Sequence, residues 1–308
     1  MATSDVSRRE VRWDRMFPDE LEAAFAACPL VYLAYGLCEP HGPQNAVGLD
    51  GLKAHAICVR AAQAHGGIVA PADMWHIHEI GGYAVWAHDW VGEPERSWLT
   101  CVPPWHHFKS ILYQIRQVDA LGFHGALLVT GHYGPNWEDL NDMVDLVQPY
   151  VGVRLRALPD FEANTPGFDG DGQSGGDHAG RVETSLLSAL MPECTDLSRI
   201  PRDQVDEHPF AMGTDVLQSD RRVGERMVAD EVRWLGAAGR GLLEAYEREQ
   251  PQARLRTFRE TERLWREVVW PELQHCRSMQ QTWHEGDAVP EDSVWYANWA
   301  PPPLEEIG

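Results

Sequence analysis

The feature that most constrains the fold is an alternation of short β-rich runs with helical segments through the first two thirds of the chain. Residues 30–36 (LVYLAYG) and 126–130 (ALLVT) predict buried strands, and residues 52–65 and 105–121 carry apolar side chains at helical spacing. Alternation of this kind places parallel strands beneath right-handed helical crossovers. We therefore predict a three-layer α/β sandwich with a mostly parallel central sheet.

Two further strands, over residues 67–72 and 153–158, and a helix over about 137–147 extend the same pattern. In parallel sheets, ligands bind beyond the carboxyl ends of the strands. Polar residues that directly follow a predicted strand are therefore the first candidates for a functional site.

The pattern changes in the last third of the chain. Residues 162–180 hold six glycines and few large apolar side chains, which predicts a long loop, and a helix should begin near Val182. Two long helical segments follow, over about 224–249 and 254–281. We expect a core of residues 1–200 and a helical C-terminal extension of residues 201–308, which packs on the core or on a neighbouring subunit.

Composition narrows the class of partner. The chain has 26 Lys and Arg against 47 Asp and Glu, a formal net charge of −21, which disfavours nucleic acid and anionic membranes. Its 6 cysteines show no CxxC spacing, so we expect reduced thiols. No apolar run reaches the roughly 18 residues of a membrane span, and residues 1–20 have no apolar leader region. We expect a soluble, cytoplasmic protein that acts on a small molecule.

Three polar clusters follow predicted strands or the glycine-rich stretch. The first contains Glu39 and His41, followed by Gly42-Pro43 and by Asp50. A Glu and a His two residues apart in a rigid turn can point at one metal ion. An exposed acidic loop would have a similar sequence.

The second cluster, residues 130–136 (TGHYGPN), places His132 at the end of a strand, and Gly134 leaves backbone N–H groups near a helix start that can face an anion. A capping turn is the alternative. The third cluster, residues 177–185 (DHAGRVETS), opens a helix. A helix N-cap explains Asp177 well but explains His178 poorly.

Together the clusters supply His, Glu and Asp without a cysteine thiolate. This mixture of nitrogen and oxygen donors suits zinc, manganese or iron. Because all three clusters reach the same edge of the sheet, the sequence predicts a metal site there.

These segments resemble the creatininase (creatinine amidohydrolase) family. Its signature is E-x-H-G-P with an Asp about ten residues on, G-H-x-x-x-N after a strand, and D-x-H-A-G-x-x-E-T-S, the last of which is compact here. The resemblance covers about residues 30–195. It implies a creatininase-like fold and a homo-oligomer, a hexamer in the family.

The resemblance also implies roles for individual residues. Glu39, His41, Asp50 and His132 would be metal ligands, with the Asp able to bridge two ions, and His178 would be the acid/base near the scissile bond. Creatininase itself carries a Glu, a ligand of its second metal, at the place of Gly134. Either Glu183 or water completes the second ion, or one ion is bound; otherwise Glu183 orients the helix or His178.

The hypothesis that follows is a metal-dependent hydrolase with one or two divalent ions per chain. An ion would lower the pKa of water towards about 7 and polarise a carbonyl. We favour the C–N bond of a cyclic amide or formamide over the C–C bond of an inositol-derived cyclic diketone. A non-catalytic metal- or ligand-binding protein is the alternative from another class.

Other residues have ordinary interpretations. Five tryptophans lie within residues 75–105, and we read them as core and interface anchors rather than as a ring-stacking pocket wall. Of the five histidines in or beside this stretch, His78 or His88 is expected to reach the site, and the others (His76, His106, His107) to pack or lie in loops. Lys53 and His55 open a helix beside Asp50 and could support the metal ligands, but we expect them at solvated positions.

Overall fold

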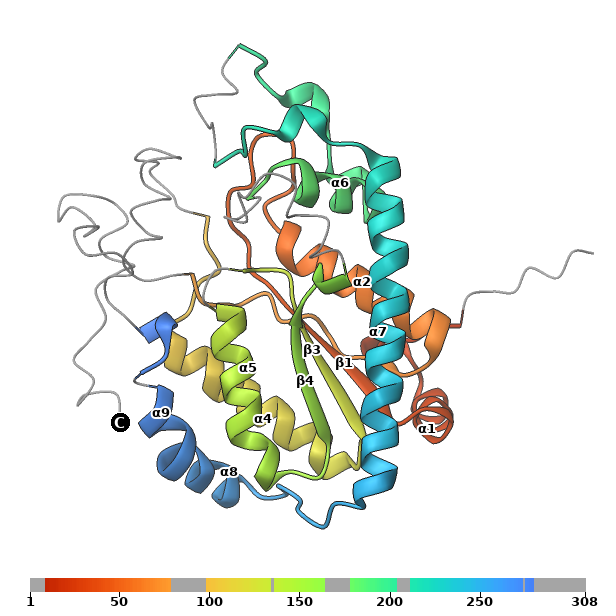
Figure 1. The fold of residues 1–308 in the computed structure, drawn as a ribbon, viewed down its shortest axis with the longest axis vertical. Helices are drawn as coiled ribbons and strands as arrows, with labels where there is room; N and C mark the ends of the chain where they lie inside the picture. The colour runs from red at the N-terminus through yellow and green to blue at the C-terminus, as the bar shows by residue number, and fades with distance from the viewer. Residues whose placement is uncertain are drawn as a thin grey trace, which may run out of the picture.

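The computed structural model describes residues 9–78, 98–133, 136–163, 178–203, 211–273 and 275–279 of the chain. Within them, four strands form one sheet: β1 (Leu30–Tyr35), β2 (Ile68–Val69), β3 (Gly125–Thr130) and β4 (Arg154–Pro159). Figure 1 labels β1, β3 and β4. The strand order is β2-β1-β3-β4 and every pairing is parallel. The predicted parallel sheet is confirmed.

Helices cover both faces of this sheet (Figure 1). Helices α4 (Pro104–Leu121) and α5 (Asn136–Val147) pack on one face, and α2 (Leu49–His65) and α7 (Arg221–Glu249) pack on the other. Successive residues of β1 point to opposite faces: Val31 joins the cluster with α4, and Tyr32 joins the cluster with α2. All residues of β1 are therefore buried, and the three-layer prediction is confirmed.

The register of the strands brings their carboxyl ends to one level. Tyr35 pairs with Thr130, and Thr130 pairs with Pro159, so β1, β3 and β4 end side by side. The segments that begin at Gly36, Gly131 and Asp160 therefore leave the sheet at a common edge.

Two glycines let the start of α2 approach this edge. A Cβ on Gly36 would lie 2.3 Å from the backbone nitrogen of Gly51, and a Cβ on Gly131 would lie 2.2 Å from the carbonyl oxygen of Asp50. Only glycine allows both close approaches. Helix α2 begins at Leu49, three residues before its predicted start, so Asp50 lies in its first turn.

The rest of the chain surrounds this core. Helix α1 (Pro18–Ala27) precedes β1, and α6 (Arg181–Leu190) packs with α7 and α2. The described residues also contain six short 3-10 helices: Trp13–Arg15, Gln148–Tyr150, Pro192–Cys194, Leu197–Arg199, Val216–Gln218 and Arg277–Met279. None of the described helices combines the length and hydrophobicity needed to cross a bilayer.

The C-terminal region differs from its prediction in one element. Helix α7 has nearly the predicted bounds, but the second long helix is broken into α8 (Phe258–Leu264), a π-helix (Trp265–Val269) and α9 (Trp270–Leu273). Pro271 lacks the N–H that a continuous helix needs, and the π-helix ends at Val269, two positions before it.

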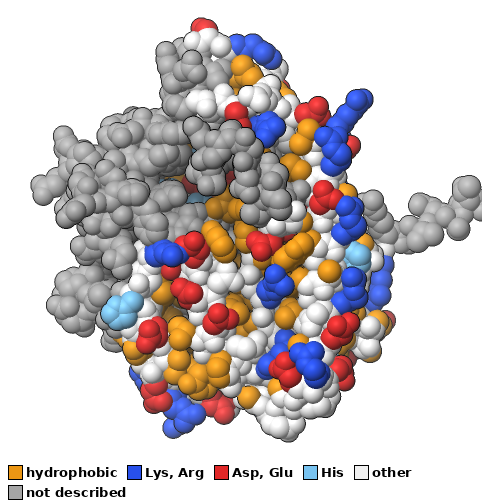
Figure 2. All heavy atoms as spheres, viewed as in Figure 1, with side chains coloured by type: hydrophobic (Ala, Val, Ile, Leu, Met, Phe, Trp, Pro, Cys, Tyr) orange, Lys and Arg blue, Asp and Glu red, His pale blue; other side chains and the backbone are white. Residues whose placement is uncertain are grey.

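Figure 2 shows that acidic and basic side chains are interspersed over the described surface of one face. On that face, the excess of negative charge is not gathered into a single patch.

Candidate metal centre

Six side chains from the three predicted clusters meet at the carboxyl edge of the sheet. Glu39 and His41 lie in the loop after β1, Asp50 in the first turn of α2, His132 after β3, His178 before α6, and Glu183 in α6. Five are buried and His178 is half-buried. The structure thus brings together every residue that the sequence proposed for the site.

Asp50 stands at the centre of this group. Its Oδ1 lies 3.2 Å from Nε2 of His41, and its Oδ2 lies 3.2 Å from Nδ1 of His132. The two oxygens of one carboxylate therefore face two different imidazoles.

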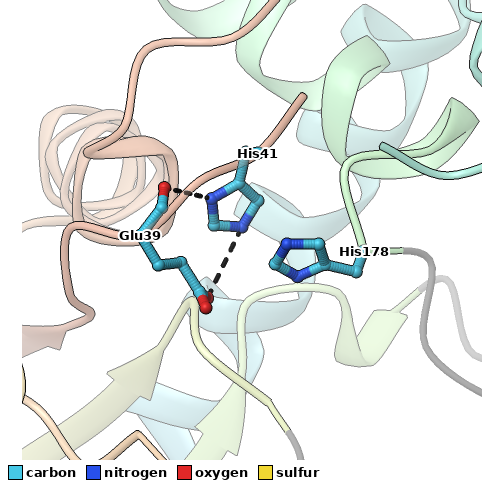
Figure 3. A group of neighbouring side chains, drawn as sticks. All are labelled: Glu39, His41 and His178. Carbon is cyan, nitrogen blue, oxygen red and sulfur yellow. Dashed lines mark hydrogen bonds and ion pairs between the residues drawn. The ribbon is translucent and has the colours of Figure 1, made fainter. Parts of the chain in front are cut away.

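The donor atoms fall into overlapping groups. Glu39, Asp50 and His132 form one group, and His41, Asp50 and Glu183 form another; within each, the donor atoms lie within 4.8 Å of one another. A third group joins Glu39 and His41 to His178, and Figure 3 shows His178 facing the other two. Asp50 belongs to the first two groups and links them.

Hydrogen bonding shows that a cation fits here. Among the residues that the structure describes, Oε1 of Glu39, Nε2 of His41 and both Asp50 oxygens are buried and make ion-pair contacts but no hydrogen bond of good geometry. Buried polar atoms ordinarily have a partner, so such atoms converging on one place fit a metal ion. His41 Nδ1 lies 3.0 Å from the Glu39 carbonyl and donates to it (Figure 3), so Nε2 is the ring nitrogen that faces the carboxylates and would bind an ion.

The charges of the site influence one another strongly. Burial would raise the pKa of Glu39, but His132 and His178 outweigh it and hold the pKa well below its usual value. Burial would lower the pKa of His41, but the Asp50 carboxylate raises it to about 9. Burial, followed by the charge of His41, lowers the pKa of His178.

The loop before α6 holds His178 in a defined orientation. His178 Nε2 lies 2.8 Å from the Pro40 carbonyl, and the next residue, Ala179, adopts the left-handed backbone conformation with φ +53°. The Ala179 N–H donates to Oε2 of Glu183 at 2.9 Å, and its carbonyl accepts from Gln44 at 3.0 Å. A strained, buried residue between His178 and Glu183 is typical of a functional site.

Comparisons with known proteins identify the fold that carries this site. Scans against protein-family models and searches of curated proteins find no match. Among solved structures, creatinine amidohydrolase (creatininase) superposes with a TM-score of 0.59 at 22% identity, covering 75% of this chain and 96% of that chain. A candidate creatinine amidohydrolase from Bacteroides fragilis gives 0.60 at 20% identity, covering 77% and 97%. The chain has the creatininase fold. A manganese form of creatininase gives 0.59 at 22%, covering 75% and 98%.

A buried network in this creatininase fold corrects one prediction. Lys53 was expected in solvent but is fully buried, because the early start of α2 places it one turn after Asp50 on the same face. Its Nζ donates to the Gly131 carbonyl at 2.5 Å and to the Tyr133 hydroxyl at 2.6 Å. It also lies 3.2 Å from Oε1 of Glu183 and 3.3 Å from Oδ2 of Asp160.

Asp160 and Tyr133 are the members of this network to which the sequence assigned no role. Asp160 follows β4 directly, and the Tyr133 hydroxyl donates to its Oδ1 at 2.5 Å. Burial would lower the pKa of Lys53, but Asp160 and Glu183 raise it. The signal was present in the sequence, since Asp160 is a polar residue at a strand end.

Among the remaining histidines that the structure describes, His78, His76 and His107 follow their predictions, whereas His55 was expected in solvent. His78 reaches the site, with Nε2 3.4 Å from Oε2 of Glu39. His76 and His107 are buried and pack ring against ring, 4.0 Å between centroids. His106 and Trp75 line a cavity of about 380 Å³, and His55 is half-buried. His88, Gly134 and Asp177 lie outside the described residues, as do Trp86 and Trp90.

Proposed function

We propose that the chain is a metal-dependent hydrolase of the creatininase family. The observation that carries the proposal is the placement of Asp50, which presents one oxygen towards His41 and the other towards His132. If two ions were bound, a carboxylate in this position could be shared by both. The creatininase fold supports the proposal, as do creatininase structures described as a manganese form and as a Zn–Zn type.

The two linked donor groups assign the ligands. Glu39, Asp50 and His132 would hold one ion, and His41, Asp50 and Glu183 the other. Glu183 would then supply the carboxylate that Gly134 cannot. When bound, such ions lower the pKa of water and polarise a carbonyl oxygen, which are the two requirements of amide hydrolysis.

His178 is the residue placed to move a proton. Its Nε2–H donates to the Pro40 carbonyl, so a neutral ring carries its lone pair on Nδ1. Burial, the largest cause of the lowered pKa of His178, favours this neutral form. The ring would accept a proton at Nδ1 and return it to the departing nitrogen, as a general base and then a general acid.

The substrate class follows from this chemistry. A small molecule with a carbonyl next to nitrogen, in a cyclic amide or a formamide, uses both the ions and the proton carrier. A mutant creatininase of the same fold is described as complexed with creatine, a small molecule. The hexameric assembly, and the division into residues 1–200 and 201–308, remain predictions.

Reconstitution tests the proposal. Protein stripped by a chelator should regain turnover on reloading with Mn²⁺ or Zn²⁺ when assayed with a panel of cyclic amides, formamides and cyclic ketones. Asp50→Asn, which keeps the shape and removes the charge, is the matched control and should stay inactive. Metal binding without turnover of any panel member would favour a binding protein, and turnover of cyclic ketones alone would favour C–C cleavage.

A further inference from the structure

The ammonium of Lys53 is a second positive charge beside a site that is proposed to hold cations. It is fully buried and lies between two carboxylates, 3.3 Å from Asp160 and 3.2 Å from Glu183. The Gly131 carbonyl and the Tyr133 hydroxyl accept its other hydrogen bonds. Four partners fix the ammonium in place, so it remains next to Glu183 when an ion binds.

Among the described residues, this charge makes its direct ion pair with a proposed ligand on one side of the site, although its field also reaches Asp50. Glu183, a member of the group with His41 and Asp50, contacts Lys53 directly. Within the part of the chain that the structure describes, Glu39 and Asp50 form ion pairs with histidines alone. Of the two groups, the one that contains Glu183 is therefore the one whose carboxylate is in direct contact with an ammonium.

We propose that Lys53 makes the two ion positions unequal. The position formed by His41, Asp50 and Glu183 binds a divalent ion more weakly than the position formed by Glu39, Asp50 and His132. The inference rests on the proposed function, since it assumes that both groups bind metal. Two effects would weaken binding at this position. The Lys53 ammonium repels a divalent ion in a buried, weakly screened environment, and it already neutralises part of the charge of the Glu183 carboxylate.

Lys53 also orients Glu183, so its removal could weaken ion binding by freeing the carboxylate, whereas loss of the positive charge should strengthen it. The contacts of the two Glu183 oxygens show which effect is larger. Oε1 faces Lys53, whereas Oε2 accepts a hydrogen bond from the Ala179 backbone at 2.9 Å and lies 3.7 Å from Nε2 of His41. Removal of the ammonium leaves the backbone hydrogen bond intact, so the carboxylate stays aimed at His41. The charge effect should therefore dominate.

Titration of metal-free protein with Mn²⁺ tests the inference through binding rather than activity. Wild type should show two binding classes that differ by about tenfold or more in Kd. In Lys53→Met the weaker class should tighten by about tenfold or more, and the tighter class should change little. Lys109→Met is the matched control, because it removes a charge that pairs with Glu262 at the surface. It should leave both classes unchanged.

A second variant keeps the test usable if Lys53→Met does not fold because Asp160 is left without its partner. The double variant Lys53→Met/Asp160→Asn removes both charges, and it should still tighten the weaker class because Lys53 contacts Glu183 directly. Two equal classes in wild type that Lys53→Met leaves unchanged would overturn the inference. A weaker class that loosens in either variant would also overturn it and make Lys53 a residue that only orients Glu183. Wild type that binds no Mn²⁺ would instead contradict the proposed function.

Discussion

The ring of His178 stacks on the ring of His41, with centroids 4.2 Å apart and planes inclined by 24°. His41 is a proposed metal ligand, and His178 is held separately by the Pro40 carbonyl. The stack therefore places a second imidazole beside the ions without requiring it as a ligand.

This arrangement predicts that His178→Ala keeps its metal and loses activity. Turnover should fall by about 10²–10⁴-fold, the usual contribution of a general acid/base. Parallel measurements of kcat and of metal content per chain check this. Undiminished turnover would assign His178 to the loop structure alone, and loss of metal would make it a ligand, in accord with its place in the third donor group.

Removal of a central ligand should abolish binding and activity together. Asp50→Ala removes both oxygens that face His41 and His132, and His132→Ala removes a donor from the first group. Elemental analysis of each purified variant, compared with wild type prepared in parallel, measures the loss. Full metal occupancy in either variant would refute its role as a ligand.

Glu183→Gln should affect one ion selectively. The amide keeps the shape and can still accept from the Ala179 N–H, but it lacks the charge that a divalent ion favours. At saturating Mn²⁺ the stoichiometry should fall by up to one ion per chain, while Glu39, Asp50 and His132 retain the other. An unaltered stoichiometry and affinity would favour a single ion, with Glu183 orienting α6 or His178.

Glu231 should make stability depend on pH. Burial raises the pKa of this α7 carboxyl to about 8. The hydrogen bond from Ala163 lowers the pKa, and the nearby carboxylates of Asp160, Glu162 and Asp230 raise it further. The folded state then binds a proton that the unfolded state releases near pH 4.5, so the free energy of unfolding falls as pH rises from about 4.5 to 8. This pKa shift corresponds to a fall in the free energy of unfolding on the order of 5 kcal/mol over that pH range.

Glu231→Gln should therefore be more stable than wild type at pH 8.5 and differ little at pH 4.5. Denaturant unfolding at both pH values measures the difference. Glu225→Gln, at an exposed position of the same helix, is the control and should follow wild type at both. The prediction would be contradicted if the free energies of unfolding of wild type and Glu231→Gln differed by the same amount at both pH values.

The need for glycine at the sheet edge can be tested by comparing an alanine substitution there with one at a glycine whose surroundings leave room for a side chain. Gly131→Ala would place a Cβ 2.2 Å from the Asp50 carbonyl and should destabilise the fold by several kcal/mol, roughly the cost of a severe steric conflict. A Cβ on Gly241 in α7 would meet no atom of the described residues within 4 Å. Gly241→Ala should stabilise by about 0.5–1 kcal/mol. Equal melting temperatures for the two variants would show that α2 can move away from the edge.

The sequence predicted the sheet and the residues of the site because both depend on local patterns. Buried apolar runs identify strands, and polar residues after strand ends reach a common edge. Lys53 was placed in solvent because its burial depends on where α2 begins. With the helix starting at Leu49, Lys53 and Asp50 share a face, and that start is allowed by two glycines far apart in the chain. The break before Pro271 could not be predicted from the helical pattern, because it depends on how the backbone hydrogen bonds rearrange around the proline.

The proposed ligands extend from Glu39 to Glu183 and come from segments after β1, in α2, after β3 and in α6. Contacts between residues so distant in sequence close large loops and form late, when the sheet is already assembled. An ion that needs all of them cannot guide early folding. It should instead bind the finished protein and slow its unfolding, so that chelation shortens the lifetime of the native state while the rate of refolding is almost unchanged.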